Sequence, residues 1–259
     1  MLQTPYGISL LDYLRLKAFG PYRKQCAVRG QSIDVGARSA LELWRCKTYE
    51  SKEPETLDWI DGFKPADVFF DIGANIGMYS LYAGVRGTRV YSFEPESQNF
   101  AGLTSNCVTN RLSNVTPYCM ALADREQFDL LYVTSTNPGD SQHNLGAENP
   151  FYKREYSGTQ GAFACSIDKL CQSYGFPVPQ HIKIDVDGLE DRILEGAQNV
   201  LSHPNFRSLL IEISGYDGQE CSAIARLASW GLHPVSMHAR EYRNGTMWAR
   251  NQVFTRTAQ

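Results

Sequence analysis

Val68-Phe-Phe-Asp-Ile-Gly-Ala-Asn-Ile-Gly77 is the stretch of sequence that decides the fold. The run Val68 to Ile72 is β-branched and aromatic apart from Asp71, which is typical of a strand buried on both faces of a parallel sheet. The two glycines that follow allow a sharp turn and a close approach of the backbone to a ligand. A helix over Met78 to Val85 would begin at this turn, and its free N–H groups would face a polar or anionic ligand group.

A second strand, Val90 to Phe93, ends at Glu94, which lies 23 positions after Asp71. In nucleotide-binding strand–helix–strand units, an acidic residue at a similar separation accepts hydrogen bonds from ribose hydroxyls. The order of strand, glycine turn, helix, strand and terminal acid predicts an adenosine-type ligand across the carboxyl ends of the two strands.

The glycine turn favours S-adenosylmethionine over a nicotinamide dinucleotide. A dinucleotide site has the pattern Gly-x-Gly-x-x-Gly, whereas Asn75 stands where the pyrophosphate would need a glycine. The carboxylate of Asp71 would repel a pyrophosphate but attract an ammonium or sulfonium group. The expected cofactor is therefore S-adenosylmethionine.

Three motifs resemble those of the FkbM-type S-adenosylmethionine-dependent methyltransferases, in the family's order, within a likeness that runs from about Glu53 to about Ile213. They are Asp71-Ile-Gly-Ala-Asn-Ile-Gly77, Phe93-Glu-Pro95 and Ile182-Lys-Ile-Asp-Val-Asp-Gly-Leu-Glu190. The resemblance implies O-methylation, often of sugars or natural-product hydroxyls. It also implies an α/β class I methyltransferase (Rossmann-like) fold, doubly wound, with a mostly parallel seven-stranded sheet and an antiparallel terminal strand. Asp187 departs from the family, which more often has glutamate there.

The expected cofactor contacts follow from the motifs and from the resemblance. In class I methyltransferases the end of the third strand holds the adenine, and that strand is expected here near Val115 to Ala121. Asp124 either accepts from the adenine amine or is a turn residue. The expected cofactor-binding residues are Asp71, Gly73, Ala74, Asn75, Gly77, Glu94, Pro95, Ala121 and Leu122.

Composition points to one substantial core. The chain has 259 residues, of which 42% are hydrophobic and 20% are charged. Its net charge of −3 gives no bulk electrostatic reason to expect nucleic acid. Seven scattered cysteines without a Cys-x-x-Cys pair predict reduced thiols in a cytoplasmic protein. We expect neither a secretory signal nor a membrane-spanning segment.

Residues 1–66 are expected to form an N-terminal helical extension that packs on a methyltransferase domain of residues 67–259. The segment Ile8 to Phe19 predicts an amphipathic helix docked through residues near helical spacing. These are Ile8, Leu11, Leu14 (or Tyr13) and Ala18.

A second helix in this extension is indicated near Lys52 to Asp61, where Pro54 suits the first turn. The resemblance implies that this helix lies over the cofactor. Glu53 or Thr56 therefore either contacts the cofactor or caps the helix.

The remaining elements are expected to alternate along the chain. A helix is expected at Glu96 to Arg111, strands at Gln127 to Val133, Ala162 to Ile167 and Ser208 to Ile213, helices at Leu189 to Leu201 and Glu220 to Trp230, and a terminal antiparallel pair between His233 and Thr255.

An insertion near residues 134–161 interrupts this pattern. It is rich in Ser, Thr, Asn, Gly and Pro and is too long for an idle connection. Segments of this kind are usually lids or binding loops, so we expect it to cover the substrate. It carries His143, Tyr152, Lys153, Arg154 and Tyr156.

The chemistry is expected at the end of the fourth strand, His181 to Val186. Burying Lys183 and Asp185 in a parallel strand is costly unless they form a structural ion pair or serve catalysis. A methyltransferase must position the acceptor oxygen, exclude water and remove the proton. We expect Asp185 or Glu190 to orient or deprotonate the acceptor hydroxyl. Lys183 would hold their charge or the developing oxyanion, and Glu212 on the neighbouring strand would complete the cluster.

Other assignments of the same residues are open. The carboxylates could hold a divalent cation, but their spacing does not require one and no metal ligand is assigned. His143 or His238 could be the base. A nicotinamide oxidoreductase would share the strand–helix–strand unit but is disfavoured by the loop sequence. A non-catalytic binding protein is disfavoured because Asp71 and Glu94 are both present.

The methyl acceptor is expected to be a small molecule or a glycan. A sugar hydroxyl is the first choice, from the resemblance, and a hydroxyl or carboxyl group of a polyketide-like or peptide product is the second. Nucleic acid and stable membrane insertion are not expected, and a homo-oligomer is possible.

Overall fold

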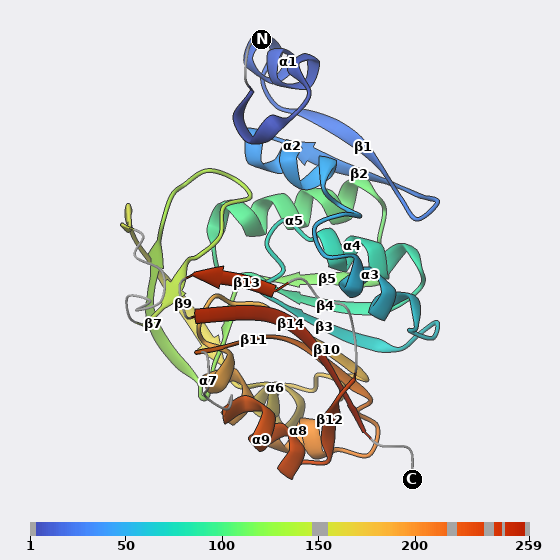
Figure 1. The fold of residues 1–259 in the computed structure, drawn as a ribbon, viewed down its shortest axis with the longest axis vertical. Coiled ribbons are helices and arrows are strands. Elements are labelled where there is room, and N and C mark those ends of the chain that lie inside the picture. Colours follow the sequence, from blue (N-terminus) through green and yellow to red (C-terminus); the bar gives the residue numbers. More distant parts are fainter. Residues whose placement is uncertain (1–3, 147–154, 217–221, 236–240, 245–246, 257–259) are drawn as a thin grey trace.

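A computed structural model describes residues 4–146, 155–216, 222–235, 241–244 and 247–256. The N-terminal segment lies at one end of the molecule, and a central sheet with helices on both faces forms the rest (Figure 1). Within the described residues, no helix is long and apolar enough to cross a membrane.

The central sheet has the order β12-β14-β11-β10-β3-β4-β5, and β13 pairs with β14 beside this path. The five strands from β11 to β5 are parallel, and β14 is antiparallel to β11. The mostly parallel sheet is as expected, but within the described residues it has eight strands rather than seven. The strands are β3 Val68–Ile72, β4 Arg89–Phe93, β5 Val115–Tyr118, β10 His181–Ile184, β11 Ser208–Tyr216, β12 Leu232–Pro234, β13 Glu241–Asn244 and β14 Met247–Arg256.

Helices cover both faces of this sheet (Figure 1). On one face lie α3 Pro54–Asp61, α4 Met78–Val85 and α5 Ser97–Thr109. On the other lie α6 Ile167–Ser173, α7 Glu190–Glu195, α8 Gln198–Ser202 and α9 Ser222–Ser229.

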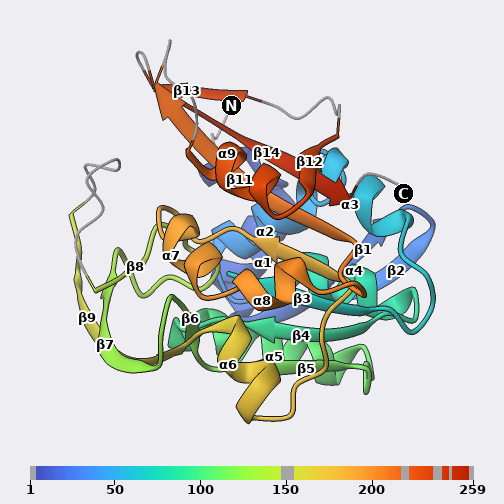
Figure 2. The same cartoon turned by 90° about the horizontal axis from the view of Figure 1, so that it is seen from below.

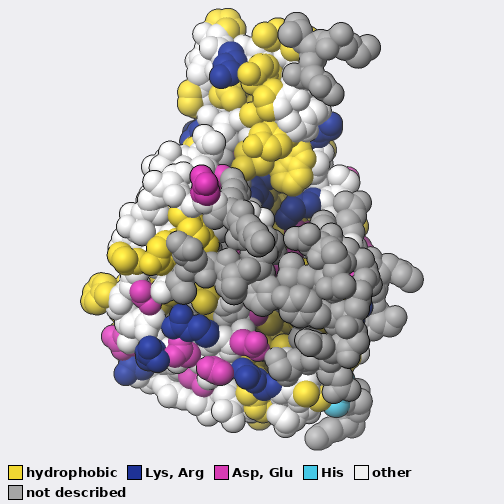
Figure 3. Space-filling view, turned by 60° about the vertical axis from the view of Figure 1, so that its left-hand side comes forward, with side chains coloured by type: hydrophobic (Ala, Val, Ile, Leu, Met, Phe, Trp, Pro, Cys, Tyr) yellow, Lys and Arg dark blue, Asp and Glu magenta, His cyan; other side chains and the backbone are white. Residues whose placement is uncertain are grey.

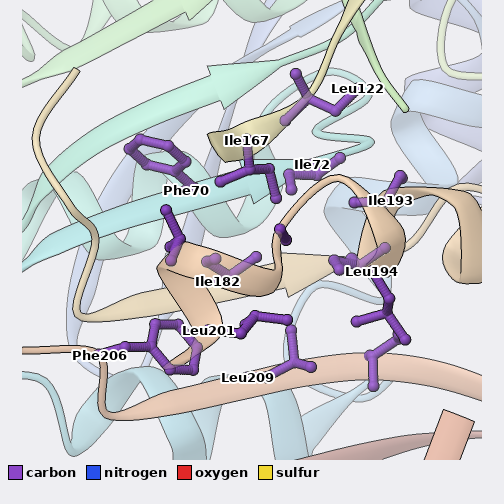
Figure 4. Packing of buried hydrophobic residues seen from close by; sticks show 14 of the residues in the cluster. Phe70, Ile72, Leu122, Ile167, Ile182, Ile193, Leu194, Leu201, Phe206 and Leu209 are labelled. Atoms are coloured by element: carbon purple, nitrogen blue, oxygen red, sulfur yellow. The ribbon is translucent and has the colours of Figure 1, made fainter. Parts of the chain in front are cut away.

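All five residues of β3 are buried, as the hydrophobic run predicts. Val68, Phe70 and Ile72 pack into the core beneath α6 to α9, whereas Phe69 packs into the core beneath α3 and α4. Figure 4 shows Phe70 and Ile72 among the side chains of the first of these cores. This alternation follows from the two-residue period of a strand.

The helix expected over Leu189 to Leu201 is broken into α7 and α8 at Gly196. The carbonyl of Gly196 accepts a hydrogen bond from the backbone of Asp168, 2.9 Å away. A Cβ at Gly196 would lie 2.3 Å from the carbonyl oxygen of Ala123, so the chain passes too close for a side chain. Tertiary packing, which periodicity does not report, causes this break.

A second, four-stranded sheet has the order β6-β9-β7-β8 and stands at one side of the central sheet (Figures 1 and 2). Its strands are β6 Ala121–Leu122, β7 Gln127–Val133, β8 Asn144–Leu145 and β9 Gly158–Cys165. Two expectations are corrected here. The third strand of the central sheet ends at Tyr118, because the chain then leaves for the second sheet, and the insertion at 134–161 contributes β8 and part of β9.

The N-terminal extension is not purely helical, because it contains a hairpin of β1 and β2. Its elements are the 3-10 helix η1 Pro5–Gly7, α1 Leu10–Phe19, β1 Tyr22–Val28, β2 Gln31–Ala37 and α2 Ala40–Lys47. The hairpin is fastened to α5 through two asparagines. Asn106 accepts from the backbone of Gly36 at 2.8 Å, and Asn110 accepts from that of Asp34 at 2.9 Å.

The docking face expected for α1 is confirmed in part, because Ile8 is buried in the extension's small core and the alternative Tyr13 packs there. Leu11 and Leu14 are 76% and 53% exposed, while Tyr13 and Leu16 pack against the extension's small core. Asp12 explains the rotation, because its carboxylate accepts from Tyr22 and Lys24 on the hairpin. Figure 3 shows the resulting hydrophobic side chains on the outside of the N-terminal segment.

Candidate active site

A cavity of about 950 Å³ opens at the carboxyl ends of β3, β4 and β10. Residues of the N-terminal extension, the loop after β7, and strands β11 and β14 complete its wall. Parallel α/β sheets bind ligands at this edge.

The loop after β3 forms one wall of the cavity with Gly73, Ala74 and Asn75. Gly73 has a φ of +78°, and a Cβ there would lie 1.9 Å from the carbonyl oxygen of Asp185. Only glycine fits this close approach to β10. Asn75 also has a positive φ, of 53°, which asparagine tolerates better than most residues. Its side chain donates to the carbonyl of Asp140 at 2.7 Å and so ties the loop after β7 to the glycine loop.

Gly77 and Asp71 lie behind this loop and are not among the residues that line the cavity. Gly77 precedes α4 with a φ of +90°, and a Cβ there would be 2.4 Å from Leu103. Asp71 is 1% exposed and accepts from the hydroxyl of Ser80. Burial raises the pKa of Asp71. The structure therefore places both residues where they support the loop.

Glu94 lines the cavity at the end of β4, as the sequence predicts. Its two carboxylate oxygens accept from the backbone of Asn75 at 2.7 Å and of Glu96 at 2.9 Å. Burial raises the pKa of Glu94 to about 7, and these two hydrogen bonds oppose the rise. The bonds fix the direction of the carboxylate and leave lone pairs for a ligand hydroxyl.

The side of the cavity next to Glu94 is apolar. Pro95, Ala121 and Leu122 lie there as expected, together with Phe93, Met120, Leu131 and Leu145. Asp124 does not line the cavity and is instead paired with Arg192 at 2.6 Å. This ion pair replaces the contact considered between Asp124 and an adenine amine.

Lys183 and Asp185 face the opposite part of the cavity, and their side chains are 2.6 Å apart. Lys183 is 1% exposed, and its ammonium lies 5.0 Å from the centre of the Tyr79 ring. Burial would lower the pKa of Lys183, but Asp185 and other carboxylates outweigh it, so the pKa is raised and the ammonium stays charged. Burial would likewise raise the pKa of Asp185, but the charge of Lys183 holds it below its ordinary value.

Glu212 lines the cavity from β11, the strand next to β10. Burial raises its pKa to about 9, and the nearby charge of Asp185 adds to the rise. Glu212 is therefore a neutral acid near pH 7, able to donate a hydrogen bond, beside an ionised Asp185.

The raised pKa of Glu212 predicts that the stability of the cofactor-free protein depends on pH. The unfolded chain releases the Glu212 proton near 4.5, whereas the folded protein keeps it to about pH 9. Between these values the folded state binds more protons, so the free energy of unfolding falls as pH rises. Glu212→Gln removes this titration. Its melting temperature should therefore rise relative to that of the wild type as pH increases from about 5.5 to about 9.

Scanning fluorimetry across this pH range measures the effect. Glu126→Gln, at an exposed position, is the matched control and should follow the wild-type curve. Parallel curves for Glu212→Gln and the wild type would contradict a buried neutral Glu212.

Glu190 lies outside the cavity lining, unlike Asp187. Its carboxylate accepts from the backbone of Gly188 at 3.2 Å and, more weakly, from that of Val186 at 3.4 Å, so it braces the turn after β10. Burial raises the pKa of Glu190 to about 7 and that of Asp187 to about 6. Asp187 accepts from the backbone of Gln142 at 2.8 Å and connects this turn to the loop after β7.

Sequence reasoning underestimated the contribution of the N-terminal extension. Glu53 lines the cavity, and its side chain makes no capping hydrogen bond; it is paired with Lys52. Thr56 is fully buried and is not part of the lining. The extension also contributes Tyr6, Leu41, Trp44, Arg45, Thr48 and Ser51. The one signal for these positions was Glu53, through the family resemblance.

The loop after β7 reaches the cavity with Asp140, Ser141, Gln142 and His143. The ring of Tyr156 instead lies tilted against that of Tyr132, with ring centroids 5.4 Å apart. Tyr152, Lys153, Arg154 and His238 lie outside the described residues. Across the part of the chain that is described, no group of three or more His, Cys, Asp or Glu side chains is placed to hold a metal ion.

The cavity fits S-adenosylmethionine. The carboxylate of Glu94 can accept from ribose hydroxyls, and the apolar side beyond it suits an adenine ring. The ionised carboxylate of Asp185 also lines the cavity and would attract a sulfonium group.

The fold and the cavity define the class as an S-adenosylmethionine-dependent methyltransferase of the α/β type. More particularly, the chain belongs to the FkbM methyltransferase family, whose methyltransferase FkbM domain matches residues 71–243. This membership confirms the resemblance, the class of enzyme and the cofactor. The nicotinamide oxidoreductase and the non-catalytic binding protein are therefore not retained.

Several known proteins are similar to this chain. The hexuronic acid methyltransferase AglP of Haloferax volcanii is 27% identical over 220 residues, which cover 83% of this chain and 85% of the relative. The 31-O-demethyl-FK506 methyltransferase FkbM of Streptomyces tacrolimicus is 25% identical over 196 residues, or 67% of this chain and 75% of the relative. The crystal structure of methyltransferase FkbM from Methylobacillus flagellatus has a TM-score of 0.47 at 17% identity, covering 83% of this chain and 55% of that one.

Proposed function

We propose that the protein transfers a methyl group from S-adenosylmethionine to a hydroxyl group of a sugar, a glycan or a sugar-like natural product. The observation that carries the proposal is the cluster of Lys183, Asp185 and Glu212 at the end of the cavity opposite Glu94. The relative AglP is a hexuronic acid methyltransferase, which supports a sugar acceptor.

The proposed acceptor subsite lies between this cluster and the N-terminal extension. Tyr6 and Trp44 bring aromatic rings to this wall, with centroids 6.5 Å apart, and Leu41 lies beside them. Aromatic faces with a few polar groups are typical of small-molecule sites. They suit the apolar face of a sugar ring whose hydroxyl points toward Asp185.

In the proposed mechanism, Asp185 accepts the proton of the acceptor hydroxyl while the new oxygen–carbon bond forms. The bound cofactor supplies the methyl carbon, and its sulfonium becomes a neutral thioether. Lys183 keeps Asp185 ionised before transfer and offsets the negative charge that develops on the oxygen. Glu212, as a neutral acid, donates to the acceptor and orients it. Glu190 positions the turn rather than the substrate, which changes the role expected from the sequence.

The same proposal assigns the cofactor contacts. Gly73, Ala74 and Asn75 would hold the methionine part, Glu94 would bind the ribose, and Pro95, Ala121 and Leu122 would contact the adenine. Asp71 and Gly77 hold the loop from behind. We further propose that residues 1–66 act as an extension of a methyltransferase domain of residues 67–259, because that extension supplies part of the wall. A cytoplasmic setting is part of the proposal and is supported by six free cysteines among the described residues.

Transfer of an isotope-labelled methyl group from S-adenosylmethionine tests the function. The acceptors would be a hexuronic acid, a neutral hexose, their nucleotide-linked and oligosaccharide forms, a macrolide polyol, an amine and a transfer RNA. Product carrying the label on a hydroxyl oxygen is the expected result. Labelling of only the amine or the RNA would overturn the proposal.

A further inference from the structure

Arg45, on α2, differs from the other cations near the cavity because it has no anionic partner among the described residues. Arg38 on the same segment is paired with Glu42 at 2.6 Å, Lys52 is paired with Glu53, and Lys183 with Asp185. Arg45 lines the cavity and makes one hydrogen bond, from Nε to the carbonyl of Gly139 at 2.8 Å.

That hydrogen bond orients the guanidinium. Gly139 has a φ of +87°, and a Cβ there would lie 3.1 Å from Glu42 and 3.6 Å from the Nε of Arg45. Glycine therefore lets the loop after β7 come close enough to hold Arg45. The same loop is fastened to α5, since the backbone N–H of Gly139 donates to the side chain of Asn99 at 2.8 Å.

The two Nη atoms of Arg45 have no hydrogen-bond partner among the described residues and are not among the fully buried unpartnered atoms. Two of the carboxylates that line the cavity are engaged elsewhere. Asp185 is held by Lys183, and Glu94 by two backbone N–H groups. A planar guanidinium fixed at Nε with both Nη groups open matches the two oxygens of a carboxylate.

We propose that Arg45 binds a carboxylate within this cavity. Two ligands of the reaction can bring one: the methionine part of the cofactor, and an acidic sugar acceptor. The position of Arg45 favours the cofactor. Arg45 is bonded to Gly139 in the loop after β7, and this loop in turn accepts a hydrogen bond from Asn75 of the glycine loop. The methionine part of the cofactor would lie along the glycine loop. A carboxylate from the cofactor requires only the methyltransferase assignment, whereas a carboxylate from the acceptor rests on the proposed sugar acceptor.

The test compares S-adenosylmethionine with decarboxylated S-adenosylmethionine, which differs in lacking the carboxylate. Calorimetry on the wild type should show tighter binding of the intact cofactor. Arg45→Gln should weaken binding of the intact cofactor by about 10- to 100-fold and leave the decarboxylated compound within about 3-fold. Arg45→Lys should recover part of the loss, since it keeps the charge and loses the planar fork.

Arg23→Gln, at an exposed position of β1 in the same extension, is the matched control and should bind both compounds as the wild type does. If Arg45→Gln binds the two cofactors as the wild type does but raises KM by about 10-fold or more for a hexuronic acid and not for a neutral hexose, the carboxylate is that of the acceptor. Unchanged cofactor binding with unchanged KM for both sugars would overturn the proposal. A wild type that binds S-adenosylmethionine but methylates no sugar would instead count against the proposed acceptor, and the cofactor comparison would still decide the role of Arg45.

Discussion

An Asp185→Asn variant is expected to methylate its acceptor with a kcat about 10²- to 10⁴-fold lower than that of the wild type, which is the usual contribution of a positioned general base. Asparagine keeps the size of the side chain but cannot take the proton. Binding of S-adenosylhomocysteine should stay within about 3-fold, because Glu94 and the apolar side of the cavity are intact. Single-turnover kinetics and calorimetry measure the two effects separately.

Stability must be followed in the same variant. Lys183 is fully buried against Asp185, and removing one partner of a buried ion pair typically costs about 3–5 kcal/mol. Assays should therefore be run well below the measured Tm. Asp191→Asn, on the exposed first turn of α7, is the matched control and should keep wild-type kcat. A normal kcat with only a raised KM would show that Asp185 binds the acceptor without acting as its base.

Replacing Glu94 by alanine is expected to weaken S-adenosylmethionine binding by about 10- to 150-fold, equivalent to about 1.5–3 kcal/mol for a hydrogen bond to a charged group. The change removes the proposed ribose acceptor. It also frees the backbone N–H groups of Asn75 and Glu96, so the glycine loop loses its support. Isothermal titration calorimetry on the purified variant measures this loss.

The pH dependence of binding separates the role of Glu94 from general damage. Its pKa is raised to about 7 by burial in the cofactor-free protein, and the ionised carboxylate is the better acceptor for ribose hydroxyls. Affinity of the wild type should therefore increase as pH rises through about 7, and Glu94→Gln should lack this increase. Glu126→Gln is expected to behave as the wild type does. Equal affinity of Glu94→Ala and the wild type would remove Glu94 from the cofactor site.

The cofactor half of the cavity could be predicted because its parts lie close together in the sequence. Residues from Val68 to Glu94 contain the buried strand, the glycine turn, the helix and the terminal acid within one strand–helix–strand unit. Gly73 occurs where the loop meets the carbonyl of Asp185, and Glu94 lies where the second strand ends. Local chemistry was enough there, because a parallel sheet places successive strand ends side by side.

The part of the cavity wall that comes from the N-terminal extension could not be predicted in the same way. Trp44 and Arg45 belong to an unremarkable short helix, and nothing in its spacing indicates a ligand. They reach the cavity because the hairpin before them is fastened to α5 by Asn106 and Asn110, through contacts between residues 70 to 76 positions apart. Single-sequence patterns do not report such distant contacts.

The proposed catalytic cluster could be predicted in part. Lys183 and Asp185 stand out in the sequence because charged residues are costly in a buried strand. Which carboxylates face the cavity was decided by the turn after β10, where Asp187 lines it and Glu190 accepts backbone hydrogen bonds instead.

By itself, the sequence determined the α/β class and the cofactor and indicated the strand end where the chemistry is proposed, because hydrophobic period, glycine turns and buried charges act within a few residues. The tertiary structure alone decided the rotation of α1, the break at Gly196, the second sheet and the placement of Arg45 in the cavity wall. Each of these depends on which distant surface a segment packs against, and the free energy of that packing is shared between parts of the chain that local patterns do not connect.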